Sequence, residues 1–244
     1  MAQLQRIAIA PSQISNGHIT LTSPQQHYLS RVLRLQNSDR FIAMDGMGKW
    51  WLAQLKQQTA EIIQPLQVET ELPVPVTLIA ALPKGNGFDD VVRCCTELGV
   101  TCITLVLSAR TLLKPSPQKL ERWRRISQEA AEQSERACIP TILEPMSFEN
   151  AVLENTAKYS YICEGRGDYL HLKQTVSENF ITGEIAIAIG PEGGWTEAEI
   201  KLAIANGFQL VSLGRRVLRA VTAPIVALSL VAGELESINR NSVH

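Results

Sequence analysis

Hydrophobic and polar residues alternate over short stretches in the first third of the chain. A period of two is typical of half-buried β-strands. Glycine-containing turns and one helical stretch separate these segments, a pattern that predicts a small β-barrel. The helix is expected to begin at Ser23, with Pro24 at its first position, and to continue through 27–35. The strands are expected at 6–10, 18–21, 41–45, 50–55 and 60–65.

The pattern changes after residues 72–75, a Leu-Pro-Val-Pro segment whose prolines favour an extended linker. Beyond it, continuous apolar runs alternate with stretches in which apolar residues recur every three to four positions. Apolar strands separated by helices indicate a parallel sheet that is covered on both faces, in an α/β domain. We therefore predict two domains, 1–72 and 73–244. The strands of the second are expected at 76–82, 102–108, 159–163, 184–189 and 209–213, and its helices at 88–99, 117–137, 196–207 and 225–235.

Composition narrows the class of protein. Of 244 residues, 45% are hydrophobic and 19% charged, which is globular rather than disordered. The net charge of −1 gives no overall signature of a nucleic-acid binder, so any such binding must come from local patches. Five cysteines without a CxxC pair and four scattered histidines argue against a disulfide framework and a metal site. The chain shows no secretory signal and no apolar run long enough to span a membrane, so we expect a cytoplasmic protein.

Two glycine-containing loops directly follow predicted strands. The first is the IGPEGG sequence at 189–194, and the second is LGRRVLRAVTAP at 213–224. Neither is a dinucleotide fingerprint or a phosphate loop, because GxGxxG and GxxxxGK[ST] are both absent. Ligands bind at the carboxyl ends of parallel strands, and arginines such as those at 215, 216 and 219 suit a phosphate or a developing anion. An ordinary tight turn and a solvated basic loop are the alternatives.

Other basic residues lie on predicted helices. Most charged residues at 117–137 are expected to form surface pairs, whereas Gln133 and Arg136, near the helix end, are candidates for ligand contact. In the first domain, Arg31 and Arg34 lie three residues apart on the helix and could contact RNA. No Ser-His-Asp set is recognisable.

Six motifs follow one another along the chain: HYLSRVLR at 27–34, LPKG at 82–85, TELGV at 96–100, EQSER at 132–136, IGPEGG at 189–194 and LGRRVLR at 213–219. In this order and spacing they resemble the RsmE family, the small-subunit ribosomal RNA uridine-N3 methyltransferases of the SPOUT superfamily. The resemblance covers nearly the whole chain.

This resemblance implies the fold and the reaction. The first domain would be a PUA-like RNA-binding β-barrel, and the second a SPOUT α/β domain with a deep trefoil knot. The protein would act as a homodimer whose active site is shared across the interface. It would transfer a methyl group from S-adenosylmethionine to N3 of a uridine in 16S ribosomal RNA of the small ribosomal subunit.

Site residues follow from the matching motifs. Direct displacement at a methyl group mainly requires positioning, and uracil N3 must lose its proton before attack. Arginines beside the base carbonyls would stabilise the resulting anion, for which the candidates are Arg136, Arg219 and, as a weaker choice, Arg110. Arg31, Arg34 and Gln133 would contact RNA. S-adenosylmethionine would be bound by Glu164, Ile189, Gly190, Pro191, Glu192, Gly193, Gly194, Leu213, Gly214, Val217, Leu218, Arg219, Thr222 and Ala223.

The sequence departs from the family pattern at several positions. Arg215, Ala220 and Val221 stand where Pro, Thr and Glu are usual. Glu135 stands where Gly is common, and Gly87 where Arg often follows LPKG. These departures support an alternative, a non-catalytic RNA-binding or ribosome-assembly protein on the same scaffold. A third hypothesis, an unknotted methyltransferase, fits less well, because the acidic residues after the loop at 84–87 are wrongly spaced.

Overall fold

The computed structural model describes residues 4–111, 114–178 and 181–240, without the side chains of 238–240. The chain forms two compact units. The first consists of Met1–Glu71 and Ala131–Ile139, and the second of Leu72–Ala130 and Pro140–His244. The segment Ala131–Ile139 thus returns to the first unit, which the sequence did not predict.

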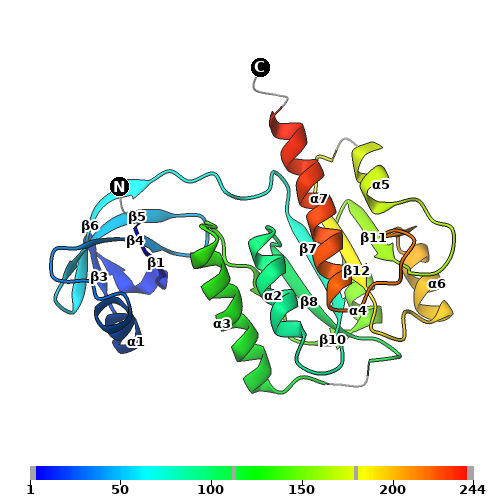
Figure 1. Cartoon of the computed structure of the whole chain (residues 1–244), viewed down its shortest axis with the longest axis horizontal. Helices are drawn as coiled ribbons and strands as arrows, with labels where there is room; N and C mark the ends of the chain where they lie inside the picture. Colours follow the sequence, from blue (N-terminus) through cyan, green and yellow to red (C-terminus); the bar gives the residue numbers. More distant parts are fainter. Residues whose placement is uncertain (1–3, 112–113, 179–180, 241–244) are drawn as a thin grey trace. The chain divides into compact units, whose positions relative to one another are not determined.

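The first unit is a curled sheet of six strands in the order β1-β4-β5-β6-β3-β2 (Figure 1). Alternate side chains point into one core, which includes Ile19, Leu29 and Phe41. Among the described residues no pairing joins the edge strands β1 and β2, so the sheet is a half-barrel rather than a closed one. The strands are β1 (Arg6–Ala8), β2 (Ile14–Ser15), β3 (His18–Thr20), β4 (Arg40–Met44), β5 (Trp50–Lys56) and β6 (Thr59–Leu66).

The helix of this unit is α1 (Ser23–His27), which continues as a π-helical turn, η2 (Tyr28–Val32); a short 3₁₀ turn, η1 (Pro11–Gln13), precedes it. Thr22 caps α1, and its side chain accepts from the N–H of Gln25 while the Gln25 side chain accepts from the N–H of Thr22. The capping box therefore lies one residue earlier than the predicted start at Ser23.

The second unit is built on a parallel sheet in the order β10-β8-β7-β12-β11-β13, with β9 beside β8. The five predicted strands are confirmed, with ends within two residues of expectation, and the α/β class is confirmed with them. The trefoil knot stays a prediction. The strands are β7 (Val76–Ala81), β8 (Cys102–Leu107), β9 (Thr141–Ile142), β10 (Met146–Ser147), β11 (Tyr159–Cys163), β12 (Ile185–Ile189) and β13 (Phe208–Val211).

Helices cover both faces of this sheet (Figure 1). The core on one face, which includes Leu78, packs against α2 (Phe88–Glu97), α3 (Pro117–Gln133), α5 (Leu172–Glu178) and α7 (Thr222–Arg240). The core on the other face, which includes Ile79, packs against α4 (Phe148–Leu153) and α6 (Glu197–Ala205). No described helix is both long and apolar enough to cross a membrane.

Helix α3 ends before the predicted residue 137. Glu135 has a left-handed φ of 63°, and the N–H of Arg136 donates to the carbonyl of Ala131 at 3.0 Å. This is the Schellman arrangement, in which the residue after the cap turns left-handed and stops the helix. Arg136 therefore lies outside the helix on which it was predicted.

Candidate active site

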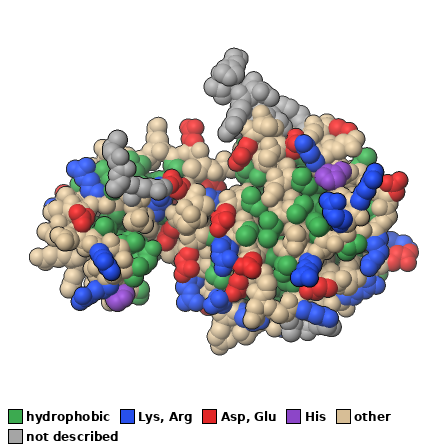
Figure 2. Space-filling view, in the orientation of Figure 1, with side chains coloured by type: hydrophobic (Ala, Val, Ile, Leu, Met, Phe, Trp, Pro, Cys, Tyr) green, Lys and Arg blue, Asp and Glu red, His purple; other side chains and the backbone are tan. Residues whose placement is uncertain are grey.

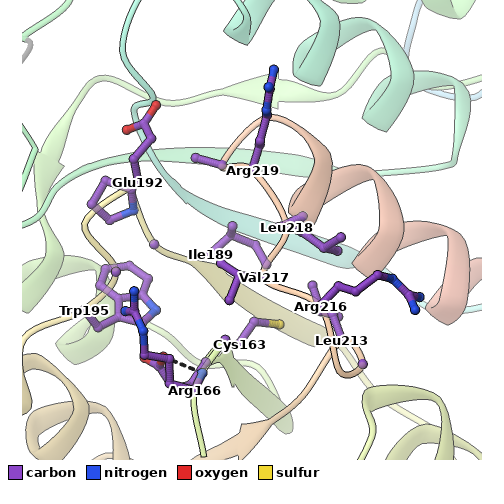
Figure 3. Close-up of a pocket in the computed structure, with 18 residues that line it drawn as sticks. Cys163, Arg166, Ile189, Glu192, Trp195, Leu213, Arg216, Val217, Leu218 and Arg219 are labelled. Carbon is purple, nitrogen blue, oxygen red and sulfur yellow. Dashed lines mark hydrogen bonds between the residues drawn. The ribbon is translucent and has the colours of Figure 1, made fainter.

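One pocket gathers the loops that follow three neighbouring strands, β12, β11 and β13 (Figure 3). Because these strands are parallel, their carboxyl ends meet at one edge of the sheet, where open α/β folds bind ligands. The cavity measures about 290 Å³. Its lining comprises Cys163, Glu164, Gly165, Arg166, Ile189, Gly190, Pro191, Glu192, Gly194, Trp195, Leu213, Gly214, Arg216, Val217, Leu218, Arg219, Ala220 and Ala223.

The loop after β12 needs its glycines. Gly194 has a φ of 70°, and its N–H donates to the carbonyl of Pro191 at 2.8 Å, which closes a tight turn. A Cβ at Gly190 would lie 3.2 Å from the ring of Trp195. That ring packs against Phe148 with the centroids 4.3 Å apart. The loop thus passes directly over a buried indole, and a side chain at residue 190 would crowd that ring.

Neighbouring segments brace the same loop. The Arg110 guanidinium donates to the carbonyls of Gly193 and Trp195. The Glu192 carboxylate accepts from the N–H of Lys84 at 2.8 Å, which ties the loop to the one after β7. These contacts fix the backbone before any ligand binds, so the pocket is largely pre-formed.

The loop after β13 carries free donors. Among the described residues, the N–H groups of Arg216, Val217 and Leu218 have no acceptor. Arg166, Arg216 and Arg219 line the pocket, and no carboxylate of a described residue forms an ion pair with them. In Figure 3, the Arg219 side chain extends to the same side of the pocket as Glu192, whereas the Arg216 side chain extends to a different side, toward the right of the view. The pocket therefore offers unpaired amides inside and unpaired positive charge at its margin.

The last residue of β11 and the loop after it supply a thiol and a carboxylate. Burial raises the pKa of the Cys163 thiol to about 12, so it stays protonated at neutral pH and is no nucleophile. Glu164 accepts from the N–H of Arg166 at 3.0 Å through one oxygen. No group of His, Cys, Asp or Glu within the described ranges could hold a metal ion.

Comparison with known proteins shows which family this chain resembles. Residues 70–232 match the RNA methyltransferase domain, and residues 21–63 match the RNA methyltransferase PUA domain. The ribosomal RNA small subunit methyltransferase E of Synechocystis is 49% identical over 95% of this chain and 78% of its own length. The protein of the same name from Bacillus subtilis is 29% identical over 95% of this chain and 94% of its own.

The chain belongs to the RsmE family. Solved structures agree with this assignment. The ribosomal RNA small subunit methyltransferase E of Neisseria gonorrhoeae, bound to S-adenosylmethionine, matches with a TM-score of 0.82 and 31% identity over 93% of this chain and 96% of that one. A Legionella pneumophila methyltransferase in complex with the same cofactor matches with a TM-score of 0.83 and 29% identity over 95% and 98%. The family predicted from the sequence motifs is confirmed.

The residues of this RsmE pocket fit S-adenosylmethionine. Apolar side chains such as Ile189, Leu213 and Leu218 suit the faces of an adenine ring, and the free N–H groups at 216–218 suit its edge. The second oxygen of Glu164 accepts no hydrogen bond from a described residue and suits a ribose hydroxyl.

Most of the predicted cofactor residues come together. Gly193 and Thr222 do not line the pocket, and Gly193 instead presents its carbonyl to Arg110. The predicted residues that do line it are Glu164, Ile189, Gly190, Pro191, Glu192, Gly194, Leu213, Gly214, Val217, Leu218, Arg219 and Ala223.

Sequence reasoning left out several lining residues. Trp195 directly follows the first glycine loop, and Arg216 lies inside the second, so adjacency to the motifs was the available signal. The missed residues are Cys163, Gly165, Arg166, Trp195, Arg216 and Ala220.

Of the three arginines predicted to act on the base, only Arg219 lines the pocket. The Arg110 guanidinium is engaged with the carbonyls of the glycine loop. Arg136 belongs to the first unit and is 2% exposed, with its guanidinium held by Glu71. Each of these two side chains would have to break these contacts to reach a substrate, and their catalytic role stays a prediction.

The predicted RNA contacts lie on the first unit. Arg31, in η2, and Arg34, which follows it with a φ of 57°, are exposed, and Gln133 is exposed at the end of α3. Their role in RNA binding stays a prediction.

Proposed function

We propose that this chain transfers the methyl group of S-adenosylmethionine to N3 of a uridine in 16S ribosomal RNA. The observation that carries the proposal is the braced pocket at three strand ends, in a chain whose relatives are named ribosomal RNA small subunit methyltransferase E. Two solved relatives that hold S-adenosylmethionine support the choice of cofactor. A ribosomal substrate implies a reaction in the cytoplasm.

Arg219 is the residue we assign to the substrate. When bound, the cofactor supplies an electrophilic methyl carbon on its sulfonium. The guanidinium of Arg219 would donate to the uracil carbonyl oxygens and favour loss of the N3 proton, because it stabilises the anion that remains. No described carboxylate neutralises this side chain, so its charge is available. Arg110 acts by holding the glycine loop in place.

The first unit is proposed to hold the RNA. Its π-helical turn presents Arg31, and Arg34 follows directly, while Gln133 is exposed on the same unit. Reversing both charges, Arg31→Glu with Arg34→Glu, is expected to weaken RNA binding and leave cofactor affinity unchanged. Unchanged RNA affinity would show that this helix is only structural.

A homodimer that shares the active site is part of the proposal. Figure 2 shows hydrophobic side chains gathered over α7 and the segment before it. Val217, in the pocket, is 68% exposed, and Val226 and Leu230 on α7 are half-buried. Light scattering should give twice the chain mass for the wild type and a monomer for Val226→Glu.

The deciding experiment is transfer of labelled methyl groups to small ribosomal subunits that lack the modification. Incorporation, with 3-methyluridine on nucleoside analysis, is the expected result. Arg219→Ala should lose turnover while keeping RNA affinity, and its neighbour Arg215→Ala, which is exposed and does not line the pocket, is the matched control. No incorporation into subunits or free RNA would favour the non-catalytic RNA-binding alternative.

A further inference from the structure

The indole N–H of Trp195 is a buried donor without an acceptor. The residue is 4% exposed, and its ring nitrogen has no hydrogen-bond partner. Within the described ranges, four buried side-chain nitrogen or oxygen atoms share this property, on Arg6, Trp50, Tyr161 and Trp195. Only Trp195 lines the pocket. Burying a donor without a partner destabilises the folded protein, so this exception calls for an explanation.

The indole is held rigidly in this position. Phe148 packs against its face with the centroids 4.3 Å apart, and Arg110 donates to its backbone carbonyl at 3.2 Å. A Cβ built on Gly190 would lie 3.3 Å from the ring nitrogen. The N–H edge therefore borders the glycine that begins the loop after β12, and any other residue there would crowd it.

We propose that the Trp195 N–H donates a hydrogen bond to bound S-adenosylmethionine and is a cofactor-recognition residue. This rests on the proposed function. The cofactor carries the acceptors that the protein does not provide, a methionyl carboxylate on one part and ribose hydroxyls and adenine nitrogens on the other. RNA is a poorer match, because the donor is buried at a strand end rather than exposed at the surface.

Trp123 offers a matched control. It is also 4% exposed and lies in the same unit, but its N–H donates to Asp89 at 2.9 Å and it does not line the pocket. Trp195→Phe and Trp123→Phe make the same chemical change, the loss of an indole N–H, at equal burial. Comparing the two variants distinguishes an indole N–H that binds a ligand from an indole N–H that stabilises the fold.

The experiment measures affinity by calorimetry and melting temperature for both variants. Trp195→Phe should weaken S-adenosylmethionine binding about threefold to tenfold, as expected for one hydrogen bond, with a melting temperature less affected than that of Trp123→Phe. Trp123→Phe should bind the cofactor like wild type. Methylthioadenosine, which lacks the methionyl carboxylate, locates the acceptor. If its affinity also falls in Trp195→Phe, the acceptor is on the nucleoside, and if not, it is the carboxylate.

Indole resonances give a second readout that does not depend on the variant. In ¹H–¹⁵N spectra of the wild type, the Trp195 indole signal should shift downfield when the cofactor is added, while the Trp123 signal stays in place. Equal affinities for wild type and Trp195→Phe, with an unmoved Trp195 signal, would overturn this inference and leave the proposed function intact. A wild type that binds neither compound would overturn both.

Discussion

Glu71→Gln tests whether Arg136 supports the fold or the reaction. Arg136 is 2% exposed and donates to Glu71 through Nε and a terminal nitrogen. The same carboxylate accepts from the N–H of Ala137 at 2.9 Å and of Cys138 at 3.1 Å. One side chain thus fastens the returning segment Ala131–Ile139 within the first unit.

The size of the effect follows from burial. Breaking a buried ion pair by removing one charge costs about 3–5 kcal/mol, because the other charge is left without compensation. A glutamine keeps one carbonyl oxygen for the backbone donors, so the lower value, about 3 kcal/mol, is expected. For a chain of this size that corresponds to a fall in melting temperature of roughly 6–12 °C.

Calorimetric melting of the purified protein is the assay, and Glu69→Gln, an exposed acid two residues earlier, is the control. S-adenosylmethionine affinity, measured well below the melting temperature, should be unchanged, because every pocket residue belongs to the second unit. A melting temperature within about a degree of wild type, together with lost turnover, would refute this reasoning and support the predicted catalytic role of Arg136.

Three further predictions concern stability. In urea titrations, Glu135→Gly should be more stable than Glu135→Ala by about 1–2 kcal/mol. Both variants lose the ion pair with Arg6, but only glycine accepts the left-handed φ without strain. Equal free energies of unfolding for the two variants would contradict this. Gly87→Ala should cost about 1–3 kcal/mol, since its Cβ would lie 2.5 Å from Val221, and adding Val221→Ala should restore most of the loss in a double-mutant cycle. Partial burial raises the pKa of Asp89, but hydrogen bonds from Arg122 and Trp123 lower it, and the net shift is downward. The stabilisation that Asp89 provides is therefore present above about pH 4 and is lost as the pH falls through the folded-state pKa. Asp89→Asn should be less stable than wild type at pH 7 and should lose less stability on acid titration.

Local signals predicted most of the second unit. A buried parallel strand is an apolar run, so the segments that became β7, β8, β11, β12 and β13 were visible in the sequence. The capping box of Thr196 and Glu199 was equally local, and the structure forms it. The two glycine loops were placed at strand ends by the same logic, and the parallel topology then brought them into one pocket.

Contacts between distant segments were not predictable in this way. Periodicity continued the helical pattern of α3 to residue 137, whereas the backbone turns at Glu135 and re-enters the first unit. There Glu132 accepts from the N–H of Ala8 at 2.8 Å, and Arg136 meets Glu71. A buried arginine that pairs with a carboxylate and an arginine that faces a substrate have the same signature in sequence, so only tertiary structure separates Arg136 from Arg219.

The departures from the family pattern bear on the non-catalytic alternative, because the structure supplies a compensating contact for several of them. Val221 and Gly87 are far apart in sequence, yet a Cβ on Gly87 would lie 2.5 Å from the Val221 side chain, so Val221 fits here because residue 87 has no side chain. Glu135 occupies a left-handed position but is held there by Arg6 at 2.7 Å. Ala220 still lines the pocket. These changes alter how the loops are supported and leave Arg219 lining the pocket, so they give the non-catalytic reading little physical support.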